Sequence, residues 1–183
     1  MDAKLLDAAM SLLAETTWDG LTLGAVADRA GVSRATFWRQ VGGKDELRAA
    51  LISRLAVDYR DALWPILTAD GTGRDRLRAA LEALCEVADR HLPLLSAVDT
   101  AFHDAEPEDK GGSPAGFVGP LTRLIRDGMA DGSLAEQEDP ETAGDLVFNT
   151  VCWPYVHLRR HHGWAPGKAR TPLLDLVVGG MAT

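Results

Sequence analysis

The stretch LTLGAVADRAGVSRATFWRQVGGKDEL at residues 21–47 contains two short helical patterns joined by a turn of small residues. Thr22 is a suitable N-cap for the first helix, because its hydroxyl can accept a hydrogen bond from a free amide of the first turn. Gly31 ends that helix, since a left-handed backbone costs glycine little, and Ser33 caps the second. The small side chain of Ala27 lets the two helices approach closely. The pattern predicts a helix-turn-helix.

The second helix of this motif carries a mixed polar and aromatic surface. Phe37 and Val41 are expected to point inward, which leaves cations, a hydroxyl, an amide and an indole N–H exposed. Such groups suit phosphates and base edges, and an α-helix fits the major groove of DNA. Arg34 and Arg39 are the candidates for base edges, because arginine to guanine is the commonest specific contact. The candidate DNA-binding residues are Thr22, Arg34, Ala35, Thr36, Trp38, Arg39, Gln40 and Lys44.

Several motifs follow one another in roughly the first third of the chain. They are LLDAA at 5–9, WDG at 18–20, LTL at 21–23, VADRAGVS at 26–33, TFWR at 36–39 and KDEL at 44–47. In these motifs the chain resembles the DNA-binding domain of TetR-family transcriptional regulators. A second, looser similarity, to the end of the seventh and the start of the eighth helix of that family, lies at LIRDGMADGSL (124–134) and DPE (139–141).

The resemblance implies an all-α chain in two parts. An N-terminal three-helix domain would bind double-stranded operator DNA, and a long fourth helix would join it to a helical domain for effector binding and dimerisation. We place the first domain at 1–48 and the second at 49–183. The resemblance also implies a ligand-responsive regulator, most often a repressor that a small apolar or aromatic effector releases from its operator.

Six positions depart from the family pattern, among them Gln40, where histidine is common, and Val41, where a larger aromatic residue is common. Trp38 stands where a tyrosine is usual, Gly42 and Gly43 replace a more rigid turn, and Gly24 has no side chain where some relatives reach a base. These departures keep an alternative open, a TetR-like helical protein that binds a ligand or a partner but has lost specific DNA binding.

Composition and charge agree with a helical regulator. The 183 residues can bury one sizeable core, and their net charge is −8. Residues 28–48 nevertheless hold five cations against three anions, a local balance of +2. An acidic body lowers non-specific DNA affinity, which depends on neutralising phosphates, so selective binding is expected. No apolar run is long enough to span a bilayer, and the N-terminus does not resemble a signal peptide. The two cysteines do not indicate a disulfide framework. We therefore expect a cytoplasmic protein with no membrane partner.

Periodicity and capping residues predict about nine helices. Their expected ranges are 2–16, 23–30, 34–40, 44–67, 74–90, 93–103, 113–131, 139–162 and 171–180, with a mobile loop at 104–112. The last two helices carry more apolar surface than one small bundle covers, as in Leu146, Leu158, Leu173 and Leu176. A homodimer through these helices would cover it, and it would hold two recognition helices about 34 to 36 Å apart on DNA.

An effector pocket is expected among the aromatic and polar residues of the second domain, because ligand pockets are mainly apolar with a few orienting polar groups. The candidates are Trp64, Asp99, Phe102, His103, Phe117, Phe148, Asn149, Cys152, Trp153 and Tyr155, with His157 as a further polar group. Ordinary core packing is the competing interpretation for each aromatic residue. Pro154 should kink the eighth helix, because it lacks an amide and clashes with the carbonyl of Thr150.

Enzymatic and metal chemistry find little support in the sequence. No set of residues has the spacing of a catalytic triad or a metal site, so we expect no catalytic residue, metal or cofactor. His157 and His161 are spaced i,i+4, but with His162 they are better explained as solvated surface.

Overall fold

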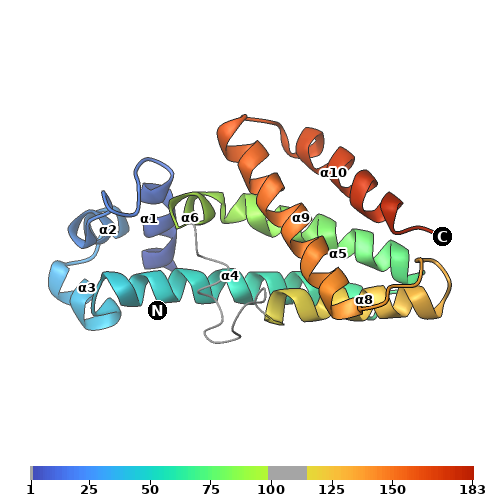
Figure 1. Ribbon diagram of the computed structural model, residues 1–183. Coiled ribbons are helices and arrows are strands. Elements are labelled where there is room, and N and C mark those ends of the chain that lie inside the picture. The colour runs from blue at the N-terminus through green and yellow to red at the C-terminus, as the bar shows by residue number, and fades with distance from the viewer. Residues whose placement is uncertain (1, 99–114) are drawn as a thin grey trace.

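The computed structural model describes residues 2–98 and 115–183. These residues fold into helices, and their only β-pairing is one isolated bridge between Leu134 and Ala182. The predicted all-α fold is confirmed. A small domain of three helices stands at one end of the molecule (Figure 1); they are α1 (Ala3–Leu13), α2 (Leu23–Ala30) and α3 (Arg34–Val41).

The turn between α2 and α3 forms as predicted. Thr22 Oγ1 accepts a backbone N–H of the first turn of α2 at 3.2 Å, and Ser33 Oγ accepts one from α3 at 3.1 Å. Gly31 has a φ of 66°, the left-handed conformation that favours glycine. Ala27 is buried between the helices, and Phe37 fills the centre of the domain. The turn therefore holds α3 so that the side of the helix opposite Phe37 faces solvent.

The long helix α4 (Lys44–Leu67) links the N-terminal domain to the rest of the chain. It begins directly after α3 and extends along the whole body (Figure 1). Its buried side contains the predicted stripe of Leu47, Leu51, Leu55, Tyr59 and Leu63, together with Ile52. The single helix α4 thus contributes buried residues to the N-terminal domain and to the rest of the chain.

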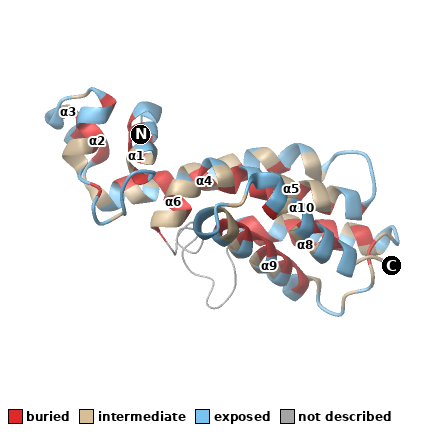
Figure 2. Cartoon of the chain, turned by 90° about the horizontal axis from the view of Figure 1, so that it is seen from above, coloured by how far each residue is buried: buried red, intermediate tan, exposed pale blue. Residues whose placement is uncertain are grey.

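The remaining helices form the body. They are α5 (Gly73–Arg90), α6 (Leu92–Ala97), α8 (Ala115–Ala130), α9 (Pro140–His161) and α10 (Pro166–Gly180). The central helix is α5, which packs against α4, α8, α9 and α10. Figure 2 shows buried residues gathered where these helices meet. The short helix α6 contacts both α1 and α9, so it joins the body to the N-terminal domain a second time.

The helices α5 and α8 approach each other unusually closely at two glycines. A Cβ on Gly73 would lie 2.1 Å from the backbone N of Gly128. The backbone N–H of Gly73 also donates to the Asp131 carboxylate at 2.6 Å. Hydrogen bonds from Ser133 and Gly73 lower the pKa of Asp131. The sequence DGMADGSL at 127–134 therefore packs against the first turn of α5 and binds its backbone.

Three predicted helix boundaries were wrong. The last helix begins at Pro166 instead of residue 171, because Pro166 occupies its first turn and the helix continues through Pro172. The sixth helix ends at Ala97 instead of 103, since Val98 is buried in an extended conformation. The first ends at Leu13, three residues early. The predicted loop at 104–112 lies outside the described residues. The helix α9 continues through Pro154.

Candidate DNA-binding surface and effector pocket

The outer side of α3 presents most of the predicted DNA-binding residues. Phe37 and Val41 are buried, which turns the opposite side of the helix outward. The indole of Trp38 is 56% exposed. Figure 2 shows α3 at the outer end of the molecule. The exposed residues on this helix are Arg34, Ala35, Trp38, Arg39 and Gln40.

The guanidinium of Arg34 lies over the start of α2. A Cβ on Gly24 would be 3.5 Å from Arg34 Nη2. Both residues line a small hollow of about 320 Å³ between α2 and α3, together with Trp38. No carboxylate pairs with Arg34 among the described residues. The missing side chain at Gly24 thus leaves room for an arginine whose five donors are available.

The hydroxyl groups of the motif serve first as caps. Ser33 Oγ donates to Thr36 Oγ1 at 3.0 Å, and the backbone N–H of Thr36 donates to Ser33 Oγ. The O–H of Thr36 can still donate outward, because a hydroxyl has one donor besides its acceptor sites. Thr22 is likewise exposed beside the first turn of α2.

Two cations of the N-terminal domain are tied to protein groups. Arg29 makes a two-pronged ion pair with Glu15, with both N–O distances 3.0 Å. It braces α1 against α2, so the positive charge of this surface is smaller than the count over 28–48 suggests. Lys44 Nζ donates to the carbonyl of Asp19 at 3.2 Å and lies over the ring of Trp18. Two of its three ammonium donors remain for a phosphate.

An aromatic cluster fills the centre of the body. The rings of Tyr59 and Phe117 stack with centroids 4.7 Å apart, and Phe148 lies 6.0 Å from Phe117. Tyr59 Oη donates to the carbonyl of Phe117 at 3.1 Å, and burial raises the pKa of this phenol. The cluster is a packed core.

Two predicted pocket residues on α9 also belong to this core. Cys152 is fully buried as a free thiol, and burial raises its pKa. Tyr155 Oη donates to Asp89 Oδ2 at 2.6 Å, and its pKa is raised by burial and by that carboxylate. Arg159 Nε also donates to Asp89, to Oδ1 at 2.6 Å. This network fastens the end of α9 to α5.

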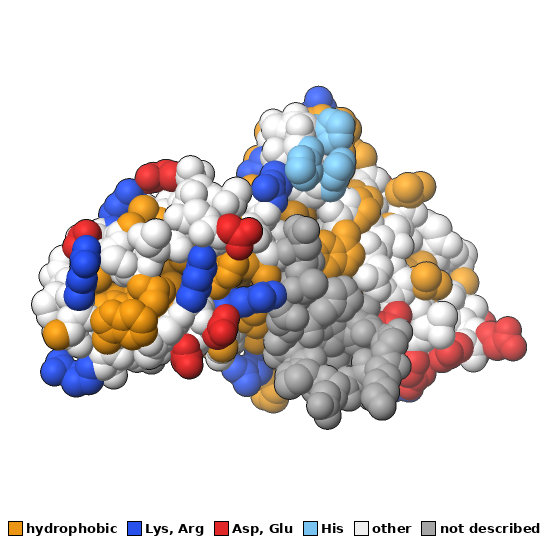
Figure 3. Space-filling view, turned by 60° about the vertical axis from the view of Figure 1, so that its left-hand side comes forward, with side chains coloured by type: hydrophobic (Ala, Val, Ile, Leu, Met, Phe, Trp, Pro, Cys, Tyr) orange, Lys and Arg blue, Asp and Glu red, His pale blue; other side chains and the backbone are white. Residues whose placement is uncertain are grey.

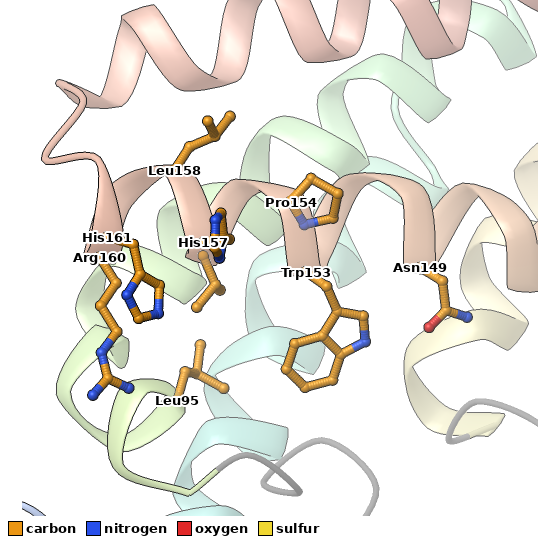
Figure 4. A pocket seen from close by; sticks show the side chains of 9 residues that line it. Leu95, Asn149, Trp153, Pro154, His157, Leu158, Arg160 and His161 are labelled. Atoms are coloured by element: carbon orange, nitrogen blue, oxygen red, sulfur yellow. The ribbon is translucent and has the colours of Figure 1, made fainter.

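A large groove in the body lies between α6 and α9. This α6/α9 groove has a volume of about 720 Å³. Figure 4 shows Trp153, Arg160 and His161 on the side of α9 that faces Leu95 of α6, whereas Leu158 points toward α10. The lining residues are Leu95, Asn149, Trp153, Pro154, Val156, His157, Leu158, Arg160 and His161.

A smaller groove, of about 310 Å³, lies between α4 and α8. In this α4/α8 groove, Phe117 forms part of the wall and Trp64, 69% exposed, stands at the rim. Arg60 supplies its cation.

The ten predicted pocket residues therefore separate into four sets. Asn149 and Trp153 line the α6/α9 groove, and Trp64 and Phe117 line the α4/α8 groove. Phe148, Cys152 and Tyr155 are buried and line neither groove, because the space they face is filled by neighbouring side chains. The remaining three, Asp99, Phe102 and His103, lie outside the described residues.

Sequence reasoning missed Arg160 and Leu95. A signal for Arg160 was present, since positions 153, 157, 160 and 161 share one helical face. His157, His161 and His162 are exposed as predicted. Residues 2–98 and 115–183 contain no group of three or more ligands suited to a metal ion.

A buried histidine connects the body to α4. His91, at the junction of α5 and α6, is 3% exposed, and its Nε2 lies 2.7 Å from Asp58 Oδ2 on α4. Its Nδ1 is buried without a hydrogen-bond partner among the described residues. Burial lowers the pKa of His91, and the hydrogen bond to Asp58 opposes this only in part. The neutral ring, with Nε2–H donating to Asp58, fits this site.

Comparison with known proteins agrees with this architecture. Residues 5–51 match the sequence profile of bacterial regulatory proteins of the tetR family. The solved structure of the regulator PfmR from Thermus thermophilus superposes with a TM-score of 0.75 at 22% identity, covering 100% of both chains. The N-terminal domain is thus of the tetR family, and the whole chain has the fold of the TetR-family regulators.

Other solved structures share the TetR-family fold along nearly the whole chain. FadR from Bacillus subtilis, in complex with stearoyl-CoA, gives a TM-score of 0.77 at 15% identity, covering 97% of this chain and 98% of its own. A structure from work on bacterial hormones that control antibiotic production gives 0.78 at 18% identity, covering 99% and 97%. No curated protein sequence matches the chain. Within the described residues of this chain, no helix combines the length and apolar character needed to cross a bilayer.

Proposed function

We propose that this chain is a regulator of the TetR family, which binds operator DNA as a homodimer and is released by a small-molecule effector. The observation that carries the proposal is the outward surface of α3, where Arg34, Trp38, Arg39 and Gln40 are exposed on a helix held by buried Phe37. A rigid helix with free cations is suited to the major groove.

The predicted DNA-binding residues have two kinds of proposed role. Arg34 and Arg39 read base edges, since a guanidinium can bond two acceptors of guanine at once. Thr22, Thr36, Trp38, Gln40 and Lys44 contact the sugar–phosphate backbone and fix the register, with Ala35 close to the bases.

Dimerisation through α9 and α10 supplies the second recognition helix. Leu146 on α9 is 61% exposed and Leu176 on α10 is 73% exposed. Exposure of such large apolar side chains on adjacent helices favours a partner surface of the same kind. A symmetric four-helix interface would bury both.

The effector acts through the helices that join body and DNA-binding domain. We assign DNA binding to 1–48 and effector binding to 49–183. Support comes from α6, which lines the α6/α9 groove through Leu95, contacts α1, and begins beside the His91–Asp58 bond to α4. A ligand that shifts α6 therefore displaces α1 and α4 together. FadR with stearoyl-CoA is an example of a chain of this fold with a bound ligand.

Selection of bound duplexes from random DNA tests this function. The expected product is an operator of two related half-sites, about one helical turn apart, bound about a thousandfold more tightly than a scrambled duplex. Affinity should fall as salt rises, because phosphate contacts release counterions. Repeating the binding against a panel of small molecules identifies the effector, whose own binding must be weakened by operator DNA to the same degree. Absence of any enriched sequence, with ligand binding intact, would favour the alternative of a regulator fold without DNA recognition.

A further inference from the structure

The α6/α9 groove combines an apolar wall with a cationic side. Trp153, Leu95 and Val156 provide apolar surface, and Arg160, His157 and His161 provide polar nitrogen atoms. In Figure 3, the histidines over the end of α9 lie directly beside Lys or Arg side chains and apolar surface. The groove therefore has two chemically different sides.

The cationic side has no counter-charge within the described residues. Of the two adjacent arginines near the end of α9, Arg159 is paired with Asp89 at 2.6 Å. Arg160 makes no ion pair with any carboxylate in 2–98 or 115–183. The rings of His157 and His161 lie 4.8 Å apart, and no carboxylate in the same ranges is paired with either. Arg160 is thus a cation at the side of an apolar groove without a carboxylate partner among the described residues, and this points to an anionic occupant.

Helix electrostatics explain only part of this arrangement. Cations in the last turn of a helix interact favourably with its dipole, and Arg159 and Arg160 both lie there. The helix dipole does not explain why one of these two arginines lines an apolar groove. Arg160 does so, whereas Arg159 is held toward α5 by Asp89 and by the carbonyl of Trp164.

We propose that the α6/α9 groove binds an amphipathic anion, with an apolar body against Trp153 and Leu95 and one acidic group on Arg160. The guanidinium can bond a carboxylate or a phosphate through two parallel hydrogen bonds. His157 and His161 add donors at the same side. A volume of about 720 Å³ accommodates a ligand of ordinary small-molecule size. The inference rests on the proposed function in one respect, since this anion would be the effector.

Calorimetric titration of the full chain with three probes of equal chain length tests the ligand class. Decanoate and decyl phosphate carry an acidic group, and 1-decanol does not. Either acid should bind at least about tenfold more tightly than the alcohol, because a charge-assisted hydrogen bond strengthens binding by that factor or more. The tighter acid identifies the preferred group. Equal affinity for acids and alcohol would overturn the proposal.

Two matched variants locate the site. Arg160→Gln should lower the affinity for the acids at least about tenfold and leave the affinity for 1-decanol unchanged. Arg60→Gln, in the α4/α8 groove, should change neither. If Arg60→Gln alone weakens acid binding, or Arg160→Gln has no effect, the α6/α9 groove is not the site. A helical circular dichroism spectrum like that of the parent confirms that each variant is folded.

These titrations contain no DNA, so they separate the two proposals. An enriched operator together with acids that bind no better than 1-decanol would refute the ligand class and leave the regulator function standing. Acid binding through Arg160 without any enriched duplex would support the ligand class and refute the DNA-binding function.

Discussion

Replacing Gly73 by alanine tests the contact that holds α5 against α8. The added Cβ would lie 2.1 Å from Gly128 N, 2.4 Å from Gly128 Cα and 2.7 Å from the carbonyl carbon of Asp127. These are backbone atoms, which cannot rotate away as a side chain does. Restoring an ordinary contact of 3.4 Å requires a separation of about 1.3 Å, the difference between 3.4 and 2.1 Å.

The expected cost is about 1 to 3 kcal/mol of unfolding free energy. Overpacking costs about 1 to 3 kcal/mol. Separation also strains the hydrogen bond from Gly73 N to the Asp131 carboxylate, which is 2.6 Å long. Alanine has a better helix propensity than glycine, which offsets about 0.5 to 1 kcal/mol of this loss. Partial relaxation of the two helices keeps the net cost below the sum of the separate contributions.

Urea unfolding at a fixed protein concentration measures this cost. The matched control is Gly167→Ala in the first turn of α10, where an added Cβ has no neighbour within 4 Å. The control should unfold at the same urea concentration as the parent or slightly higher. Gly73→Ala with parental stability, or an equal loss in the control, would refute the packing argument.

Three further perturbations test other parts of the account. Lys44→Ala should weaken binding to selected and scrambled duplexes alike and reduce the salt slope by about one; lower stability with an unchanged slope would assign Lys44 only to the Asp19 carbonyl. The parent chain is expected to sediment as a dimer and Leu176→Glu as a monomer, and a dimer in both would exclude α10 from the interface. Because burial lowers the pKa of His91, the unfolded chain binds its proton more readily, so stability should fall as pH drops below about 6.5. His91→Gln should lack that part of the pH dependence in urea unfolding, and the same dependence in both proteins would contradict the assignment.

Local features of the fold could be predicted from the sequence. The turn at Gly31, the caps at Thr22 and Ser33, and the buried stripe of α4 depend on residues close in sequence. Their physical causes are capping, left-handed backbone and helical periodicity, all visible in a short window. The exposed side of α3 follows from the same periodicity, because Phe37 fixes which side is inward.

Features that depend on distant residues could not be predicted. Periodicity indicates that Phe148 and Tyr155 point inward, but it does not indicate whether the space they face is filled. Phe117 packs against Phe148, and Asp89 accepts a hydrogen bond from Tyr155. The pairing of Arg29 with Glu15 likewise depends on how α1 crosses α2.

The cationic side of α3 is proposed to read duplex DNA. The most direct measurement is the affinity of Arg34→Ala for the selected operator and for a scrambled duplex of equal length. We expect a loss of about 1 to 3 kcal/mol on the operator, relaxed preference at one base pair, and little change on the scrambled duplex. An equal loss on both duplexes, or no loss on the operator, would contradict this proposal.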